Sequence, residues 1–252
     1  MQGTQGLELR GLWEKKEEGV TFVGDVFGQN LTLKGYQIED FHAKLNCAID
    51  AVVIREAHFS DRAGTLSIKQ LNFSKNKETQ KWHINIPLVR GRDIHPSNLR
   101  KQGAPTPQEK PFHIRNLVFE NIQGEIGNLL SLRGWGSFNF TNAYKKEFSI
   151  FDTPLEVIKN LGFDPGLFTP VSGQVSCQLK NGQLCLLDLK NTHSEGMCSQ
   201  FYLAPDLEPS YIDLAGNVCV NLRMKQDVVL KFGEPFTVSI QGNVDKPRYK
   251  LR

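Results

Sequence analysis

The residue types that most often act as general bases, nucleophiles and metal ligands are present but scattered. The chain has six histidines and five cysteines. No HxxxH, HExxH or HxH pattern joins the histidines, and no CxxC pattern joins the cysteines, so neither set has the spacing of a metal site. The histidines are His42, His58, His83, His95, His113 and His193.

Motifs for nucleophilic catalysis and phosphate binding are also missing. The sequence contains no GxSxG, GxGxxG or GxxxxGK[ST] pattern. The run His58-Phe59-Ser60-Asp61 holds the residue types of a catalytic triad, but at the spacing of a surface turn. Paired carboxylates such as Glu39-Asp40 stand beside turns in polar surroundings, which favours a solvated face over acid–base work. The sequence therefore predicts a protein that is not an enzyme and that needs no cofactor and no metal.

The five cysteines are best interpreted as small buried hydrophobic residues, because four of them fall inside expected strands. An alternative is a cross-strand disulfide in an oxidising compartment, Cys177–Cys185 or Cys198–Cys219. The full set is Cys47, Cys177, Cys185, Cys198 and Cys219.

Composition and charge indicate an ordered globular protein without a nucleic-acid partner. The 252 residues are 39% hydrophobic and carry a formal net charge of +3, with Lys and Arg spread along the chain. No apolar run approaches the roughly 18 residues of a membrane span. The first residues lack the apolar region of a signal peptide. We therefore expect either a cytosolic protein or a piece of a longer one whose targeting segment lies elsewhere.

Alternation of apolar and polar residues dominates the chain and predicts a long, mostly antiparallel β meander. One hairpin is expected around Gly28-Gln29-Asn30, and another at Asn181-Gly182, the strongest short hairpin signal present. Further short strands are expected at residues 48–54, 64–71, 82–86 and 130–132.

A segment rich in proline, glycine and basic residues interrupts the meander at residues 91–111 and is expected to be an exposed loop. It divides the chain into a β meander at 1–90 and a second β region at 112–252. One short helix is expected near 154–161, with Pro154 in its first turn and Leu155, Ile158 and Leu161 as its apolar stripe.

The strands of the second region have one apolar and one polar face, and water cannot be the partner of the apolar face. It packs in a filled β-sandwich or barrel, is covered by helices, or lines a groove for apolar ligands such as acyl chains. The candidate groove residues are Phe138, Phe140, Val175, Leu179, Leu184, Leu186, Val218, Val220, Leu222, Phe236, Val238 and Ile240.

From about residue 112 to the end, the order of motifs resembles the C-terminal region of the AsmA-like envelope proteins, the group that includes YhdP and TamB relatives. The resemblance starts with a glycine-rich strand, Gly134-Trp135-Gly136-Ser137-Phe138, before the expected helix. It continues through Thr169-Pro170-Val171-Ser172-Gly173 and Leu179-Lys180-Asn181-Gly182-Gln183-Leu184. It ends with Ile212-Asp213-Leu214-Ala215-Gly216-Asn217 and the terminal strand from Phe236 to Pro247.

The resemblance implies an elongated, curled β-sheet with an apolar groove, associated with the inner membrane and lying in the periplasm of a bacterial envelope. It implies a role in moving phospholipid between membranes or in outer-membrane assembly, with lipid acyl chains and envelope proteins as partners. The family's N-terminal membrane anchor is not in this sequence, so we expect a fragment or a truncated relative.

Overall fold

The computed structural model describes residues 6–16, 19–33, 36–61, 63–95, 113–141, 170–194, 199–213, 215–226, 236–243 and 246–251. These residues are almost entirely antiparallel β-strand, which confirms the predicted all-β meander. All paired strands belong to one sheet, so the described residues do not form the two facing sheets of the alternative β-sandwich. The chain divides into two compact units, 1–104 with 116–135, and 105–115 with 136–252.

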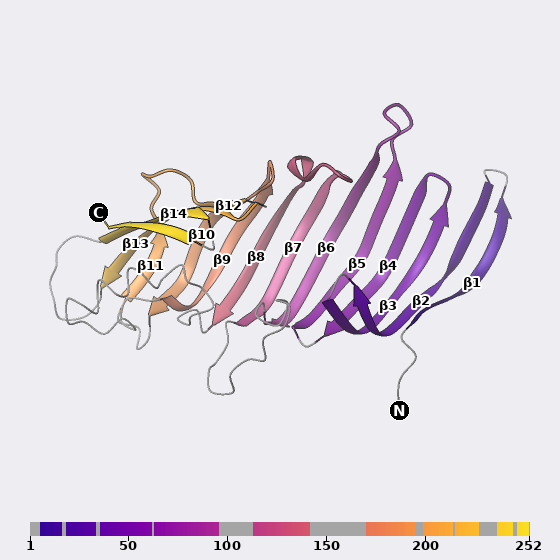
Figure 1. Ribbon diagram of the computed structural model, residues 1–252, viewed down its shortest axis with the longest axis horizontal. Helices are drawn as coiled ribbons and strands as arrows, with labels where there is room; N and C mark the ends of the chain where they lie inside the picture. The colour runs from indigo at the N-terminus through magenta and orange to yellow at the C-terminus, as the bar shows by residue number, and fades with distance from the viewer. Residues whose placement is uncertain are drawn as a thin grey trace. The chain divides into compact units, whose positions relative to one another are not determined.

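Unit 1 contains six complete strands that follow one another in sequence order and lie side by side in Figure 1. They are β1 (Gly6–Lys16), β2 (Gly19–Leu33), β3 (Tyr36–Ala48), β4 (Ala51–Asp61), β5 (Gly64–Lys75) and β6 (Trp82–Ile94). Most of β7 (His113–Glu125) also belongs to this unit. From β1 to β6, each strand pairs antiparallel with the next.

Unit 2 contains most of β8 (Arg133–Thr141) and all later strands. These are β9 (Pro170–Lys180), β10 (Gln183–Ser194), β11 (Ser199–Leu203), β12 (Tyr211–Asp213), β13 (Asn217–Gln226), β14 (Phe236–Asn243) and β15 (Lys246–Leu251). Both β11 and β12 pair with β10 and with β13, so these two short strands share one place in the sheet.

The hairpin predicted at Asn181-Gly182 is present between β9 and β10. Both turn residues have positive φ, 52° and 72°, as a type I′ turn requires. The turn predicted at Gly28-Gln29-Asn30 was wrong: β2 continues through it, and Gly28 and Gln29 pair with Phe41 and Asp40 of β3. Asn30 has φ 51°, a left-handed conformation that is common in turns. Here it occurs inside a continuous strand, which explains why the Gly-Gln-Asn sequence resembled a turn.

Two other expectations fail at their boundaries. The first residues of the loop predicted at 91–111 continue β6 to Ile94. The strand predicted at 130–132 is a 3-10 turn, η2 (Leu129–Ser131), because Ser131 Oγ accepts a 2.7 Å bond from the Glu125 amide and donates one to Asn128 O. The helix predicted near 154–161 lies outside the described residues.

The strands of unit 1 contain irregularities that reverse the alternation of side chains. In β4, Glu56 has φ 52°, and the register with β3 shifts by one residue between His42 and Lys44. Val52 pairs with Cys47, and Phe59 pairs with Phe41, and these two β3 residues share one face. Val52 and Phe59 therefore face the same side although they are an odd number of residues apart.

Unit 2 has the buried apolar core of the described chain. Phe140 and Val175 form one buried cluster with Ile114, Phe138, Leu186 and Leu189 packed around it. Val218, Val220, Leu222 and Ile240 form a second cluster, which also contacts Leu186 and Leu189. These two leucines of β10 therefore join the clusters.

The opposite, more polar face of β13 is covered as well. Residues 204–210, between β11 and β12, cross it through hydrogen bonds to Asn221: its amide donates to Ser210 Oγ at 2.9 Å, and its Nδ2 donates to Glu208 O at 2.9 Å. Arg223 pairs with Asp206 of the same segment. Cys219 and Asn221 are consequently 5% and 3% exposed.

Candidate functional site

The most distinctive surface of unit 1 is a row of apolar side chains that crosses all six strands on one face. Cross-strand pairing places one residue from each strand in line, and paired residues share a face. The row consists of Trp13, Phe22, Cys47, Val52, Phe73 and Ile84.

A second row crosses the same six strands several residues further along them. It consists of Leu7, Gly28, Phe41, Phe59, Leu66 and Gly91. The rings of Phe41 and Phe59 contact each other at a tilt, with centroids 4.8 Å apart. The residues between the two rows on this face are also small or apolar, and they include Leu9, Val26, Ala43, Leu45, Ile54, Ala57, Ile68 and Leu71. We call this surface of unit 1 the apolar face.

No buried apolar cluster comparable with those of unit 2 occurs among the described residues of unit 1. Several large side chains of the apolar face remain open to solvent: Leu7 is 64% exposed, Leu9 54%, Trp13 72% and Leu66 38%. A contiguous exposed apolar surface of this kind marks a site of contact with a ligand, a membrane or another protein.

Phe22 is an exception on this face, since it is only 4% exposed. Its ring lies over Gly11 and Gly24, where an added Cβ would stand 2.5 Å and 2.8 Å from the ring. Trp13 covers it from the side at a centroid distance of 5.1 Å. Because the two glycines have no side chains, the Phe22 ring packs directly on the backbone of the sheet. It forms a buried part of the apolar face.

The opposite face of unit 1 is polar and charged. Arg10 Nε lies 2.7 Å from Glu8 Oε1, and Lys44 pairs with Glu56. His42 stacks on Phe27 with ring centroids 4.8 Å apart. The sheet of unit 1 is therefore amphipathic: its ion pairs lie on this face, which also holds Phe27, Leu12 and Val23, and the continuous apolar rows lie on the other.

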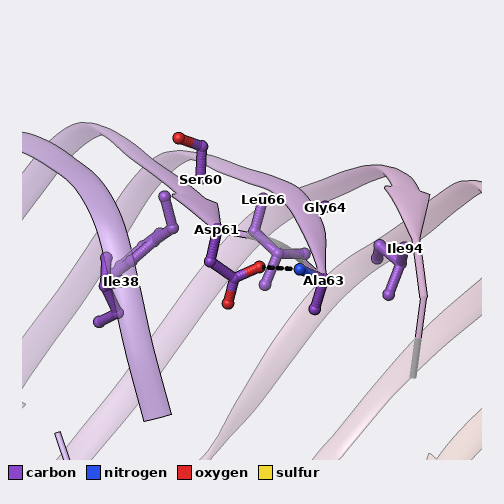
Figure 2. A pocket seen from close by; sticks show the side chains of 8 residues that line it. Ile38, Ser60, Asp61, Ala63, Gly64, Leu66 and Ile94 are labelled. Atoms are coloured by element: carbon purple, nitrogen blue, oxygen red, sulfur yellow. Dashed lines mark hydrogen bonds between the residues drawn. The ribbon is translucent and has the colours of Figure 1, made fainter. Parts of the chain in front are cut away.

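A small pocket lies where the apolar face meets the β4–β5 turn (Figure 2). Its volume is about 70 Å³, and its lining is Ile38, Phe59, Ser60, Asp61, Ala63, Gly64, Leu66 and Ile94. Asp61 Oδ1 accepts a 2.6 Å hydrogen bond from the Ala63 amide and so fixes the turn. The pocket is far below the roughly 300 Å³ of a small-molecule site, so it extends the apolar face rather than forming a site of its own.

The groove residues predicted from the sequence lie in unit 2, and the structure packs most of them against one another. Six are buried in the two clusters: Phe140, Val175, Val218, Val220, Leu222 and Ile240. Phe138, Leu186 and Val238 pack against those clusters, and Leu179 and Leu184 are half-buried partners across the β9–β10 hairpin. Phe236 pairs with Met224, and its side chain is outside the described set. Whether any of them contacts a ligand stays a prediction.

Sequence reasoning missed the apolar face of unit 1. Its signal was present as alternation in two phases, Val52 and Ile54 followed by Ala57 and Phe59. A search for a single unbroken period of two divides such a strand into two short pieces and loses its common face.

The cysteines of unit 2 do not support the Cys177–Cys185 disulfide. Cys177 pairs with Leu186, whereas Cys185 pairs with Gln178, so the two thiols point to opposite faces of the hairpin. Both are free, as are Cys47 and Cys219. Burial raises the pKa of the Cys177 thiol to about 11. Cys198, the partner in the other suggested disulfide, lies outside the described residues.

The described residues contain no group of three His, Cys, Asp or Glu side chains arranged to hold a metal ion. They also contain no helix with the length and apolarity to cross a membrane.

Comparisons of the chain with protein-family models, with curated proteins and with solved structures found no match.

Proposed function

We propose that this protein is a non-enzymatic component of a bacterial cell envelope that binds the acyl chains of phospholipids on its apolar face. On this proposal it acts in lipid transport between membranes or in outer-membrane assembly, as the resemblance to AsmA-like proteins implies. The observation that carries the proposal is the apolar face of unit 1, which crosses six strands and leaves Leu7, Leu9 and Trp13 more than half exposed.

Acyl chains suit this surface because they need no directional contacts. Transfer of a methylene from water to an apolar surface contributes about 0.8 kcal/mol, so a chain that covers Leu9, Trp13 and Leu66 is held by area alone. The rows of the apolar face run from strand to strand, which gives a continuous path for hydrocarbon. The charged opposite face stays in water, with its ion pairs at Glu8–Arg10 and Lys44–Glu56.

The first test measures lipid carried by the protein. Native mass spectrometry of the purified chain is expected to show co-purified phospholipid, and the delipidated protein is expected to take up a fluorescent phospholipid from phosphatidylethanolamine–phosphatidylglycerol vesicles. Leu9→Glu and Leu66→Glu place a charge on the apolar face at exposed positions, so they lower the uptake without a folding defect.

Val23→Glu is the matched control. Val23 is 42% exposed and pairs with Leu12 and Asn46 on the opposite face, so this variant keeps the uptake of the wild type. Equal uptake by Leu9→Glu, Leu66→Glu and wild type, with circular dichroism unchanged, would contradict lipid binding on the apolar face. Binding without transfer between donor and acceptor vesicles would contradict the transport role alone.

A role as a protein-interaction module through edge-strand pairing is the second candidate. This role is favoured by β1, which among the described strands pairs only with β2 and so has backbone groups that another strand can pair with.

A further inference from the structure

Strand β1 is an edge strand of the part of the chain that the structure describes. Among the described strands it pairs only with β2, and its 11 residues keep one uninterrupted register from Gly6↔Gln29 to Lys16↔Gly19. It contains no proline and no bulge, and its residues from Leu7 to Lys15 are exposed. The outward N–H and C=O groups of such a strand are ready to pair with another strand.

The edge at the other end of the strand order is different. β15 has only six residues and carries Pro247, Arg248 and Lys250. A short strand with proline and exposed basic residues is a common protection against strand addition. β1 has no proline and is not short, so its charges are its one protection of this kind. On the polar face these charges alternate in sign along the strand, as Glu8, Arg10 and Glu14.

We propose that β1 pairs with β1 of a second copy of this chain, antiparallel and about a two-fold axis at Leu12. In an antiparallel pair of identical strands, each residue lies opposite its mirror position across the axis. An axis at Leu12 places Arg10 opposite Glu14 twice. It also places the two Leu12 side chains, each 73% exposed, against each other on the polar face.

Other registers are less favourable. An axis at Gly11 places Glu8 opposite Glu14 twice, and an axis at Arg10 places the two guanidinium groups opposite each other. An axis at Leu9 brings Glu8 opposite Arg10, but it pairs only Gly6–Leu12 and leaves Trp13 uncovered. Charge complementarity and length of pairing therefore favour Leu12.

The same register fits the apolar face. Trp13 of each copy lies opposite Gly11 of the other, beside the Phe22 ring that lies over this glycine, so aromatic side chains of the two copies come together on the apolar face. Trp13 is 72% exposed in the single chain, so the pairing covers a large apolar side chain that has no cover there. The apolar faces of both copies then join across the axis.

The test measures the mass of the delipidated protein in solution, so its result does not depend on lipid binding. Sedimentation analysis is expected to show a monomer–dimer equilibrium. Arg10→Glu and Glu14→Arg each replace two attractive pairs by two repulsive pairs and weaken the dimer by about tenfold or more. The double variant with both changes restores the attraction and recovers the dimer of the wild type.

A second measurement fixes the register. Residues opposite each other in antiparallel strands have Cα atoms about 4.5–5.5 Å apart, which is within reach of a disulfide. Leu12→Cys is therefore expected to form a disulfide between the two introduced thiols of a dimer under mild oxidation, whereas Val23→Cys, on the same face one strand further in, is not. A wild type that is monomeric at every concentration, or a double variant as weak as the single ones, would overturn the proposal.

Discussion

Individual side chains in the two units differ in how completely the fold covers them. Ile240 in β14 is 1% exposed and lies in the cluster with Val220 and Leu222, whereas Trp13 in β1 is 72% exposed. Substitutions at buried positions of unit 2 therefore report on stability, and substitutions on the apolar face of unit 1 report on what the face binds.

Ile240→Ala is expected to lower the free energy of unfolding by about 2–5 kcal/mol, because it opens a cavity where neighbouring strands cannot close in. Leu187→Ala is the control, since Leu187 is 47% exposed, and its effect stays within about 0.5 kcal/mol. Urea denaturation followed by circular dichroism measures both. A loss at Ile240 no larger than that at Leu187 would show that the second cluster is not a packed core.

Asp213 predicts a pH dependence. Its carboxylate accepts hydrogen bonds from Asn217 Nδ2 at 2.8 Å and from the amides of Asn217 and Ala215, and these bonds lower its pKa below 3.8. The folded chain thus binds this proton more weakly than the unfolded chain. The stabilisation is complete above 3.8 and is lost as the pH falls through the lowered value.

Asp213→Asn removes that contribution, so its Tm lies below that of the wild type near neutral pH. The difference is expected to stay constant down to about pH 4 and to shrink below it. Thermal melts at several pH values measure it. A difference that persists unchanged in acid would show that the carboxylate charge has no role in the turn.

At the scale of the strands, the left-handed residue in β4 is the point to test. Glu56 has φ 52°, a conformation that costs a residue with a Cβ roughly 1–2 kcal/mol and that glycine adopts freely. Its ion pair with Lys44 is exposed and contributes little. Glu56→Gly is therefore expected to be neutral or stabilising, and Glu56→Val to destabilise by about 1–2 kcal/mol.

Chemical denaturation of the two variants, compared with wild type, measures this. Lys44→Gln separates the contribution of the ion pair from that of the backbone. If Glu56→Val were as stable as Glu56→Gly, the left-handed conformation would not be required at this position.

The strands show which parts of the fold the sequence could predict. Turn chemistry is local, so Asn181-Gly182 predicted its hairpin correctly. The all-β class followed from alternation alone. The ends of β4 and β6 could not be found in this way, because the alternation changes phase near Glu56 and near Leu88, and a search for one regular pattern ends there.

The candidate site was harder to predict for the same reason. Alternation of apolar and polar residues is regular in strands such as β13. The sequence therefore predicted Val218, Val220 and Leu222 as site residues, and the structure buries them in a cluster. The apolar face of unit 1 depends on cross-strand register, for example Phe59 opposite Phe41. Register between strands is set by turns and bulges that no single strand reveals.

At the scale of the whole molecule, the two units predict different resistance to local opening. β13 is buried on both faces, by the second cluster on one side and by residues 204–210 on the other. β4 is also an interior strand, but its apolar side belongs to the apolar face. Amide hydrogen exchange is therefore expected to be slower in β13 than in β4.

Hydrogen exchange measured by mass spectrometry on the delipidated protein compares β4 with β13. Both strands have hydrogen-bonded neighbours on each side, so a difference in their exchange rates reflects burial of their faces. Added phospholipid is expected to slow exchange in β4 and to leave β13 unchanged. Equal exchange of the two strands without lipid would contradict the difference in burial as a source of stability.

The phase change at Glu56 also restricts how such a chain can evolve. β5 matches the irregularity of β4, since Val52 stays in line with Phe73, and Phe59 with Leu66. β3 has no such irregularity, and its register with β4 shifts by one residue instead. Loss or gain of one residue in one strand would turn half of that strand's side chains to the wrong face. Insertions and deletions within these strands are therefore disfavoured, whereas loss or duplication of a whole hairpin keeps every remaining register intact. Lineages of this protein should differ in length by pairs of strands.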